Sequence, residues 1–156
     1  MTTELSSQTG TSPVTATPPA AADQAHAHFS AKLAYEADPA DVAKAIAAGS
    51  PEFTLVDCRA AGNYTKAHLP NAVSLPWQDI APDTVASLPP GLLVTYCWGP
   101  SCNAATKGAE RLSGLGRQVK EMIGGIEYWI REGHPTEGRR PVVRGEERPA
   151  DWGLVT

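Results

Sequence analysis

The sequence predicts an α/β fold in which a parallel β-sheet is covered by helices on both faces. Short apolar segments of strand length alternate along the chain with segments of helical periodicity. The connections between these segments are short, and no internal repeat is visible. The chain has 156 residues, of which 42% are hydrophobic and 19% charged, so one domain with a sizeable core is expected.

The predicted strands are short runs of apolar and β-branched residues. A brief edge strand is expected at residues 35–36. Four longer strands are expected at residues 53–57, 72–75, 92–96 and 118–122. Ligands of open parallel sheets bind beyond the carboxyl ends of the strands, where Cys58 and Cys97 both fall.

The predicted helices are placed by capping signals and apolar periodicity. They are expected at residues 29–33, at 39–48, in a turn that ends at 64, weakly within 76–88, and at 103–115 and 126–131. The helix at 39–48 has the clearest boundaries: Asp38 is a favourable N-cap, Pro39 suits the first helical position, and Gly49 ends it.

The composition divides the chain into three parts. Residues 1–25 are expected to form a disordered tail, because Thr, Ser, Pro and Ala supply 17 of these 25 residues and leave little apolar surface to bury. Residues 26–134 are expected to form the folded domain. Residues 135–156 are rich in Arg, acidic residues, Gly and Pro, and are expected to be a mostly irregular C-terminal tail.

Charge and hydropathy argue against several classes of function. The net charge is −4 and there is no basic run, so no nucleic-acid partner is expected. No apolar stretch approaches the roughly 18 residues of a membrane span, and no secretory signal is visible. Three cysteines make a disulfide framework improbable. We therefore expect a reduced, cytoplasmic protein without a membrane partner.

The loop that follows the most apolar strand carries most of the chemical information. It consists of Cys97, Trp98, Gly99, Pro100, Ser101, Cys102 and Asn103. Because it joins a strand to a helix N-terminus, its backbone N–H groups are expected to form a cradle for an anion or a thiolate. Cys97 would then have a lowered pKa and act as a nucleophile, with the alternative that it is a small apolar residue at a strand end.

Three sequence blocks together resemble the rhodanese family. They are LVDCR at 55–59 followed by Tyr64, AHLPNA at 67–72 and LP at 75–76; the cysteine loop; and GGIEYW at 124–129 with Gly133 and Pro135. The resemblance covers residues 29–135. It implies a three-layer α/β sandwich with a parallel sheet of about five strands and helices on both faces.

The resemblance also implies a function. Cys97 would take up a sulfane sulfur as a persulfide and pass it to a thiol or to cyanide. The expected partners are a small sulfur donor, either a persulfide or thiosulfate, and a thiol acceptor. No cofactor is expected.

The loop differs from the usual pattern of the family at its end. The usual loop ends with an Arg that helps to bind an anionic donor such as thiosulfate, whereas Cys102 stands at that position here, and Pro100 stands where a Gly is usual. A persulfide is therefore expected to be the better donor. Cys102 is also a candidate resolving thiol that could pair with Cys97; the alternative is that it fills the space of the absent Arg.

Other chemically capable residues have more ordinary interpretations. Asp57 and Arg59 are expected to support the loop as a structural pair, and Cys58 to be buried and inert. His68 is expected to fix a turn. No metal site is expected, because the cysteines contain no C-x-x-C pair.

Three alternative functions can be compared with sulfur transfer. A phosphatase or arsenate reductase on the same fold needs a loop one residue longer that ends in Arg, but Asn103 stands there. Dithiol redox sensing would use Cys97 and Cys102. A catalytically weak or inactive domain that binds a protein partner is suggested by the missing loop cation.

Overall fold

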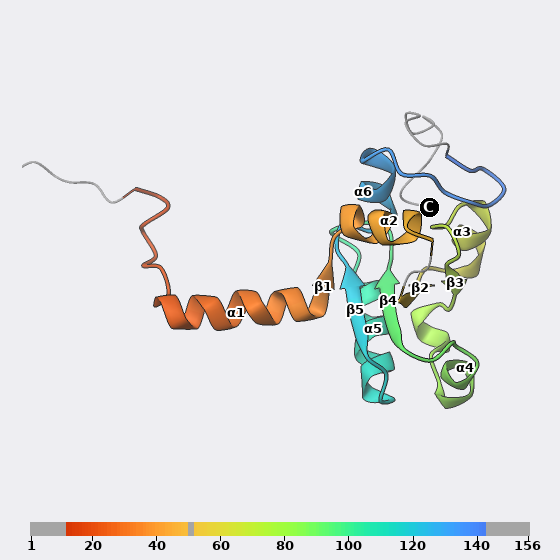
Figure 1. The fold of residues 1–156 in the computed structure, drawn as a ribbon, viewed down its shortest axis with the longest axis horizontal. Coiled ribbons are helices and arrows are strands. Elements are labelled where there is room, and N and C mark those ends of the chain that lie inside the picture. The colour runs from red at the N-terminus through yellow and green to blue at the C-terminus, as the bar shows by residue number, and fades with distance from the viewer. Residues whose placement is uncertain (1–11, 50–51, 143–156) are drawn as a thin grey trace, which may run out of the picture. The chain divides into compact units, whose positions relative to one another are not determined.

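The structure is a computed structural model that describes residues 12–49 and 52–142. Its elements alternate between helix and strand along the chain (Figure 1). They are α1 (Ala22–Tyr35), β1 (Glu36–Ala37), α2 (Pro39–Ala47), β2 (Phe53–Asp57), α3 (Ala61–Lys66), β3 (Val73–Ser74), the 3₁₀ turn η1 (Trp77–Asp79), α4 (Pro82–Ala86), β4 (Leu92–Tyr96), α5 (Ala104–Gly114), β5 (Val119–Met122) and α6 (Gly125–Arg131).

The strands form one five-stranded sheet in the order β1-β5-β4-β2-β3. Every strand pair is parallel, with β4 paired to β2 through five registered positions and to β5 through three. The predicted α/β class and parallel sheet are confirmed. β4 is the central strand, so the segment that follows Tyr96 leaves the middle of the carboxyl edge.

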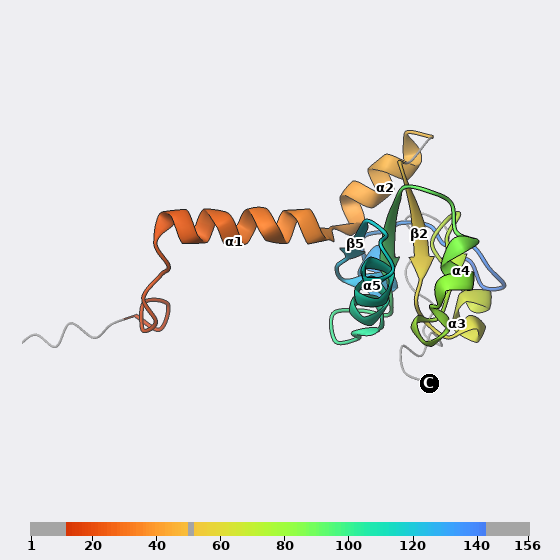
Figure 2. The ribbon, with the colours of Figure 1, turned by 90° about the horizontal axis from the view of Figure 1, so that it is seen from below.

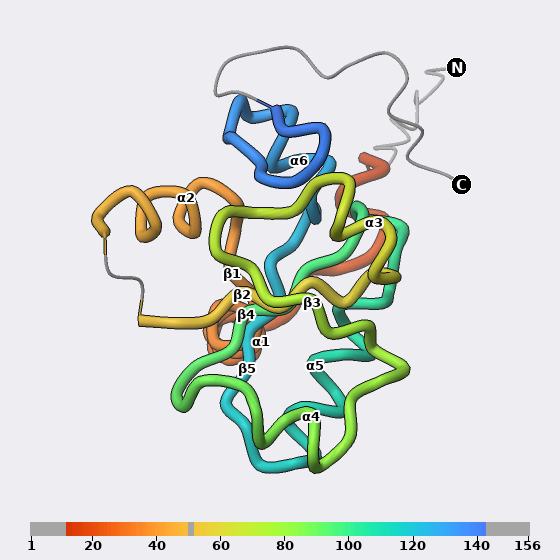
Figure 3. The backbone as a smooth tube through the Cα atoms, turned by 90° about the vertical axis from the view of Figure 1, so that its right-hand side faces the viewer, coloured from red at the N-terminus to blue at the C-terminus, as the bar shows by residue number. Residues whose placement is uncertain are grey.

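Alternate residues of the central strands point to opposite faces of the sheet, as the period of two requires. Val94 and Tyr96 of β4 pack in the core beneath α2 and α6. Leu93 of β4 and Val56 of β2 pack in the core beneath α4 and α5. Helices therefore cover both faces (Figure 3), and α4 and α5 lie together on one of them (Figure 2).

The helix α2 forms as its sequence signals predicted. The side chain of Asp38 accepts a hydrogen bond from the Asp41 N–H at 2.7 Å, which satisfies one donor of the first turn. Pro39 occupies the first turn, and Gly49 follows the helix with a φ of 95°. The bounds of β2 and β4 also coincide with the predicted segments.

The N-terminal helix differs from the prediction. α1 begins at Ala22, inside the segment expected to be a tail, and continues for 14 residues instead of covering only 29–33. Its Ala-rich sequence has high intrinsic helix propensity, which the composition argument for a tail did not weigh. Residues 1–11 of the predicted tail lie outside the described residues.

The chain beyond the predicted domain boundary packs on the domain. Residues 135–142 contain no helix or strand, but Val142 is buried, and His68 and Glu137 exchange backbone hydrogen bonds in an antiparallel bridge. Apolar burial and backbone pairing thus fix a segment whose composition suggested a tail. Residues 143–156 lie outside the described part of the chain.

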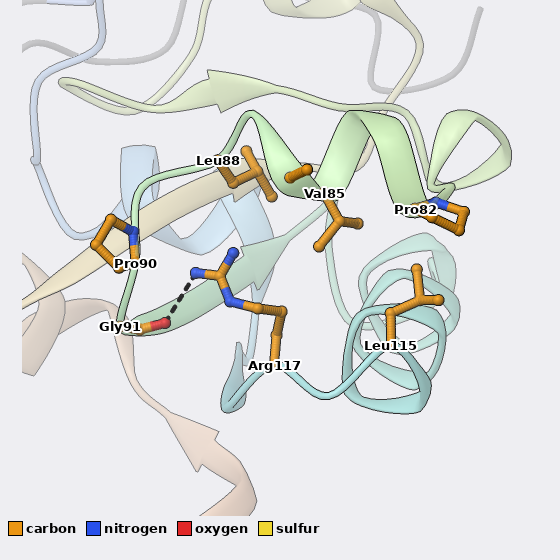
Figure 4. Close-up of a pocket in the computed structure, with 8 residues that line it drawn as sticks. Pro82, Val85, Leu88, Pro90, Gly91, Leu115 and Arg117 are labelled. Carbon is orange, nitrogen blue, oxygen red and sulfur yellow. Dashed lines mark hydrogen bonds between the residues drawn. The ribbon is translucent and has the colours of Figure 1, made fainter.

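An open groove of about 590 Å³ lies at the end of β4 that is opposite to Cys97 (Figure 4). Its walls include Val85, Leu88 and Leu115, and the guanidinium of Arg117 donates a hydrogen bond to the Gly91 carbonyl at 3.0 Å. Among the described residues, no helix combines the length and the apolar character that crossing a bilayer requires.

Gly108 of α5 is a position where the packing allows no side chain. A Cβ there would lie 2.5 Å from the sulfur of Cys58, which is buried on the same face of the sheet. We expect Gly108→Ala to lower the free energy of unfolding by about 1–3 kcal/mol, because the added methyl group overpacks the core. This loss should exceed the gain from the higher helix propensity of alanine. Denaturant unfolding measures the change.

A double-mutant cycle separates the contact from other effects of the substitution. In a Cys58→Ala background, Gly108→Ala should be neutral or stabilising, because the clashing sulfur is gone. Gly114→Ala is the control, since no atom lies within 4 Å of its added Cβ. An equal loss from Gly108→Ala in both backgrounds would contradict the contact.

Candidate active site

Cys97 follows the last residue of β4 and is 2% exposed. Its position at the carboxyl end of the central strand places the sulfur against the loop that leads into α5. The chain turns back within this loop, because the Cys102 N–H donates to the Gly99 carbonyl at 3.0 Å. The Cys97 thiol donates to the Cys102 carbonyl, also at 3.0 Å. The two ends of the loop therefore meet.

The backbone N–H donors of the loop are divided between two sulfur atoms. Those of Ala105 and Gly99 point to Cys97. Those of Ala104 and Trp98 point to Cys102. The N–H groups that were expected to face Cys97 therefore serve both cysteines.

The predicted cradle residues contribute unequally. Trp98 and Gly99 supply N–H groups, whereas Pro100, Ser101 and Asn103 have exposed side chains, and Asn103 only precedes the helix. The remaining donors, those of Ala104 and Ala105, belong to the first turn of α5. Sequence reasoning placed the helix start near them but could not show which way their N–H groups point.

The two thiols differ in acidity in the direction opposite to the expectation. Burial raises the pKa of Cys97 to about 12, and its interaction with Cys102 adds to this, so that the N–H groups of Ala105 and Gly99 only partly offset it. The pKa of Cys102 is lowered. Its burial acts to raise it, but the Ala104 N–H, the Cys97 thiol, the Trp98 N–H and the charge of Arg59 together outweigh that effect.

The N-terminus of α6 fixes the loop from the other side. The N–H groups of Ile126 and Glu127 donate to the carbonyls of Cys97 and Trp98, each at 2.9 Å. Gly125, with a φ of 60°, lets the two backbones meet, because a Cβ there would lie 2.6 Å from the Cys97 carbonyl oxygen. Gly125 is thus a packing requirement of the loop.

A buried network of Asp57, Arg59 and Tyr96 lies beneath the loop. The Arg59 guanidinium donates to both carboxylate oxygens of Asp57, at 2.6–3.2 Å, with side-chain exposures of 1% and 0%. The Tyr96 hydroxyl donates to Asp57 at 2.7 Å and accepts the Leu69 N–H at 3.1 Å. Tyr96 was not predicted, although a tyrosine ending a buried strand signals a hydroxyl that needs a partner.

Arg59 faces the loop with part of its guanidinium already bound. Its guanidinium also donates to the Ala67 carbonyl, and it lies 4.5 Å from the centre of the Trp98 ring. Its Nε and one terminal nitrogen are directed to Asp57 and Ala67, and its positive charge lies near Cys102.

A carboxylate lies on the outer side of the loop. Glu127 pairs with Arg131 at 2.9 Å, and a Cβ on Gly99 would lie 2.6 Å from a Glu127 oxygen. A carboxylate oxygen therefore lies next to Gly99, with the Arg131 guanidinium as its counter-charge. Sequence reasoning assigned Glu127 no role of its own.

The remaining candidates lie away from reactive surroundings. Cys58 is 1% exposed, and burial, together with the charge of Asp57, raises the pKa of its thiol. His68 stacks on Tyr64 with ring centres 3.8 Å apart and contacts the Tyr64 carbonyl, as a turn-fixing residue would. In the described ranges, no three His, Cys, Asp or Glu side chains gather as a metal site would require.

A comparison with protein families identifies the class of domain to which this chain belongs. The sequence model of the family described as the Rhodanese-like domain matches residues 38–132. That match covers more than half of the chain, so the chain belongs to the rhodanese-like domain family.

Three relatives show the extent of the similarity. A protein of Bacillus halodurans is 43% identical, with a TM-score of 0.74 over 76% of this chain and 88% of that one. A thiosulfate sulfurtransferase of Pseudomonas aeruginosa is 29% identical, with a TM-score of 0.57 over 69% of this chain and 20% of that one. An HTH-type transcriptional regulator of Mycobacterium tuberculosis is 33% identical over 61% of this chain, which spans 42% of that regulator.

The acidities of the cysteines predict the order in which they are alkylated. At neutral pH, iodoacetamide should modify Cys102 first, Cys97 at least about tenfold more slowly and Cys58 last, because the thiolate is the reacting species. Lowering the pH should protect Cys102 only below the ordinary range of a thiol, whereas Cys97 should gain reactivity as the pH rises. Limited alkylation with fragment-level peptide mapping measures the order.

The Cys102→Ser variant is the control for this order. Cys97 should remain slow in that variant, since burial is the main cause of its raised pKa. Modification of Cys97 ahead of Cys102 at neutral pH would contradict the assignment.

Removing the charge of Asp57 from the buried ion pair should strongly destabilise the fold. Asp57→Asn should lower the free energy of unfolding by about 3–5 kcal/mol, because it leaves the Arg59 guanidinium buried without a counter-charge. Thermal or denaturant unfolding measures the loss. Arg131→Gln, which removes the exposed pair with Glu127, should cost about 0.5 kcal/mol or less. Similar losses from the two variants would contradict the role of the buried pair.

Proposed function

We propose that this chain is a sulfurtransferase that moves a sulfane sulfur through a persulfide on Cys97 to an acceptor thiol or to cyanide. The observation that carries the proposal is the position of the Cys97 sulfur. It lies at the carboxyl end of β4, receives the N–H groups of Gly99 and Ala105, and donates its own proton toward Cys102. A buried sulfur with converging N–H donors is suited to hold a persulfide anion.

The proposed reaction uses the second thiol as a proton acceptor. As the Cys97 sulfur attacks the sulfane sulfur of the donor, its proton turns from the Cys102 carbonyl to the nearby Cys102 thiolate, and the donor thiolate departs. The Cys97 persulfide anion then remains against the Gly99 and Ala105 N–H groups. An acceptor thiolate attacks the outer sulfur, and Cys97 regains its proton from Cys102.

The surroundings of the loop favour a persulfide over thiosulfate as donor. The loop ends in Cys102 instead of a cation, and Arg59 directs its donors to Asp57 and Ala67. A small persulfide and a thiol acceptor are therefore the proposed partners. The three free cysteines of the chain fit a reducing compartment, and we propose the cytoplasm.

The test is sulfur transfer to cyanide, measured as thiocyanate, with glutathione persulfide and with thiosulfate as donors. The wild-type chain should use the persulfide about tenfold or more better than thiosulfate, since a missing charge-assisted hydrogen bond costs about 1.5–3 kcal/mol. Cys97→Ser should lose the activity with both donors.

Cys58→Ser is the matched control, because it removes a buried thiol that lies outside the proposed chemistry. It should retain the wild-type rate as long as its unfolding transition shows a folded protein. Equal rates for the wild type and Cys97→Ser would exclude the proposed intermediate.

A further inference from the structure

Cys102 lies where a second thiol can reach the sulfur of Cys97. The Cys97 sulfur is 3.0 Å from the Cys102 carbonyl oxygen, and its thiol is also within hydrogen-bonding reach of the Cys102 sulfur. The turn that joins the Cys102 N–H to the Gly99 carbonyl holds this arrangement. Cys102 is half-buried, whereas Cys97 is 2% exposed, so Cys102 is the more accessible of the two residues.

We propose that Cys102 is a second catalytic residue that resolves the Cys97 persulfide, so that the chain reduces sulfane sulfur to hydrosulfide. The inference rests on the proposed persulfide of Cys97. The Cys102 sulfur attacks the inner sulfur of the persulfide, a Cys97–Cys102 disulfide forms, and the bond to the outer sulfur breaks. The outer sulfur leaves as hydrosulfide with the proton of the Cys102 thiol.

This step balances without an outside oxidant. The sulfane sulfur gains two electrons and becomes hydrosulfide, while the two thiols lose two electrons and become one disulfide. A dithiol reductant then opens the disulfide by exchange and returns both cysteines to the thiol state. The half-buried position of Cys102 gives such a reductant its point of attack.

The acidities of the two sulfurs favour attack on the inner sulfur. Attack on the outer sulfur would expel the Cys97 thiolate, which is a poor leaving group because burial raises its pKa to about 12. Attack on the inner sulfur expels hydrosulfide, the weaker base. The geometry agrees, since the Cys102 sulfur already lies beside the inner sulfur.

The surroundings of Cys102 also favour its activation. The Ala104 and Trp98 N–H groups point to its sulfur, and the positive charge of Arg59 lies near it. The carboxylate of Asp57 binds the Nε and one terminal nitrogen of Arg59 and so holds the guanidinium in place. A thiol in this position ionises readily, so its sulfur can attack as its proton passes to the departing outer sulfur.

The test follows the fate of one sulfur atom on the full chain. Fully reduced protein, freed of reductant, receives an excess of glutathione persulfide until loading is complete, and intact mass is then measured under non-reducing conditions. The wild type should lose the mass of two hydrogens, show a Cys97–Cys102 disulfide by peptide mapping and release hydrosulfide. Cys102→Ser should keep the mass of one added sulfur on Cys97 and release hydrosulfide at least about tenfold more slowly.

The other outcomes separate this inference from the proposed function. A wild type that keeps its persulfide as long as Cys102→Ser does would overturn the resolving step and leave sulfur transfer intact. Absence of added sulfur and of disulfide in both proteins would overturn the proposed function as well. Sulfur carried on Cys102 in Cys97→Ser would reverse the two roles. A disulfide in the wild type beside a Cys102→Ser variant that never loads would show that Cys102 acts before the persulfide, and would also overturn the inference.

Discussion

The buried ion pair between Asp57 and Arg59 connects the segments that surround the reactive cysteines. Asp57 ends β2, receives the Tyr96 hydroxyl from β4 and binds Arg59, which in turn reaches the Ala67 carbonyl. Neither charge is accessible to water, so each depends on the other for compensation. The network thereby joins β2, the end of β4 and the chain after α3 in one geometry, and it holds Arg59 beneath Trp98 as a fixed charge.

The loop is held on its other side by backbone contact instead of charge. α6 begins with Gly124 and Gly125, and its first N–H groups bind the carbonyls of Cys97 and Trp98. The close approach works only because Gly125 has no Cβ. Between this contact and the first turn of α5, the N–H donors of the loop have fixed directions before any ligand arrives. Such preorganised donors stabilise a sulfur anion without the cost of reorienting the site during reaction.

As a consequence, the two cysteines of the loop differ in burial and in acidity. Burial makes Cys97 a thiol that keeps its proton, while the nearby N–H groups and the charge of Arg59 make Cys102 the more acidic partner. The loop thus places a buried thiol next to a half-buried, more accessible one.

Much of this arrangement could be predicted from the sequence, because it depends on local patterns. Apolar runs gave the bounds of β2 and β4, Asp38 and Pro39 gave the start of α2, and alternation of strands and helices gave the parallel sheet with cysteines at strand ends. The helical state of α1 and the packing of residues 135–142 were missed, because composition alone does not weigh Ala-rich helix propensity or the burial of Val142.

Only the tertiary structure decided which thiol ionises. That depends on how deeply each sulfur is buried and on which N–H groups face it, and both are set by elements far apart in sequence: the end of β4, the first turn of α5, the start of α6 and Arg59 after β2.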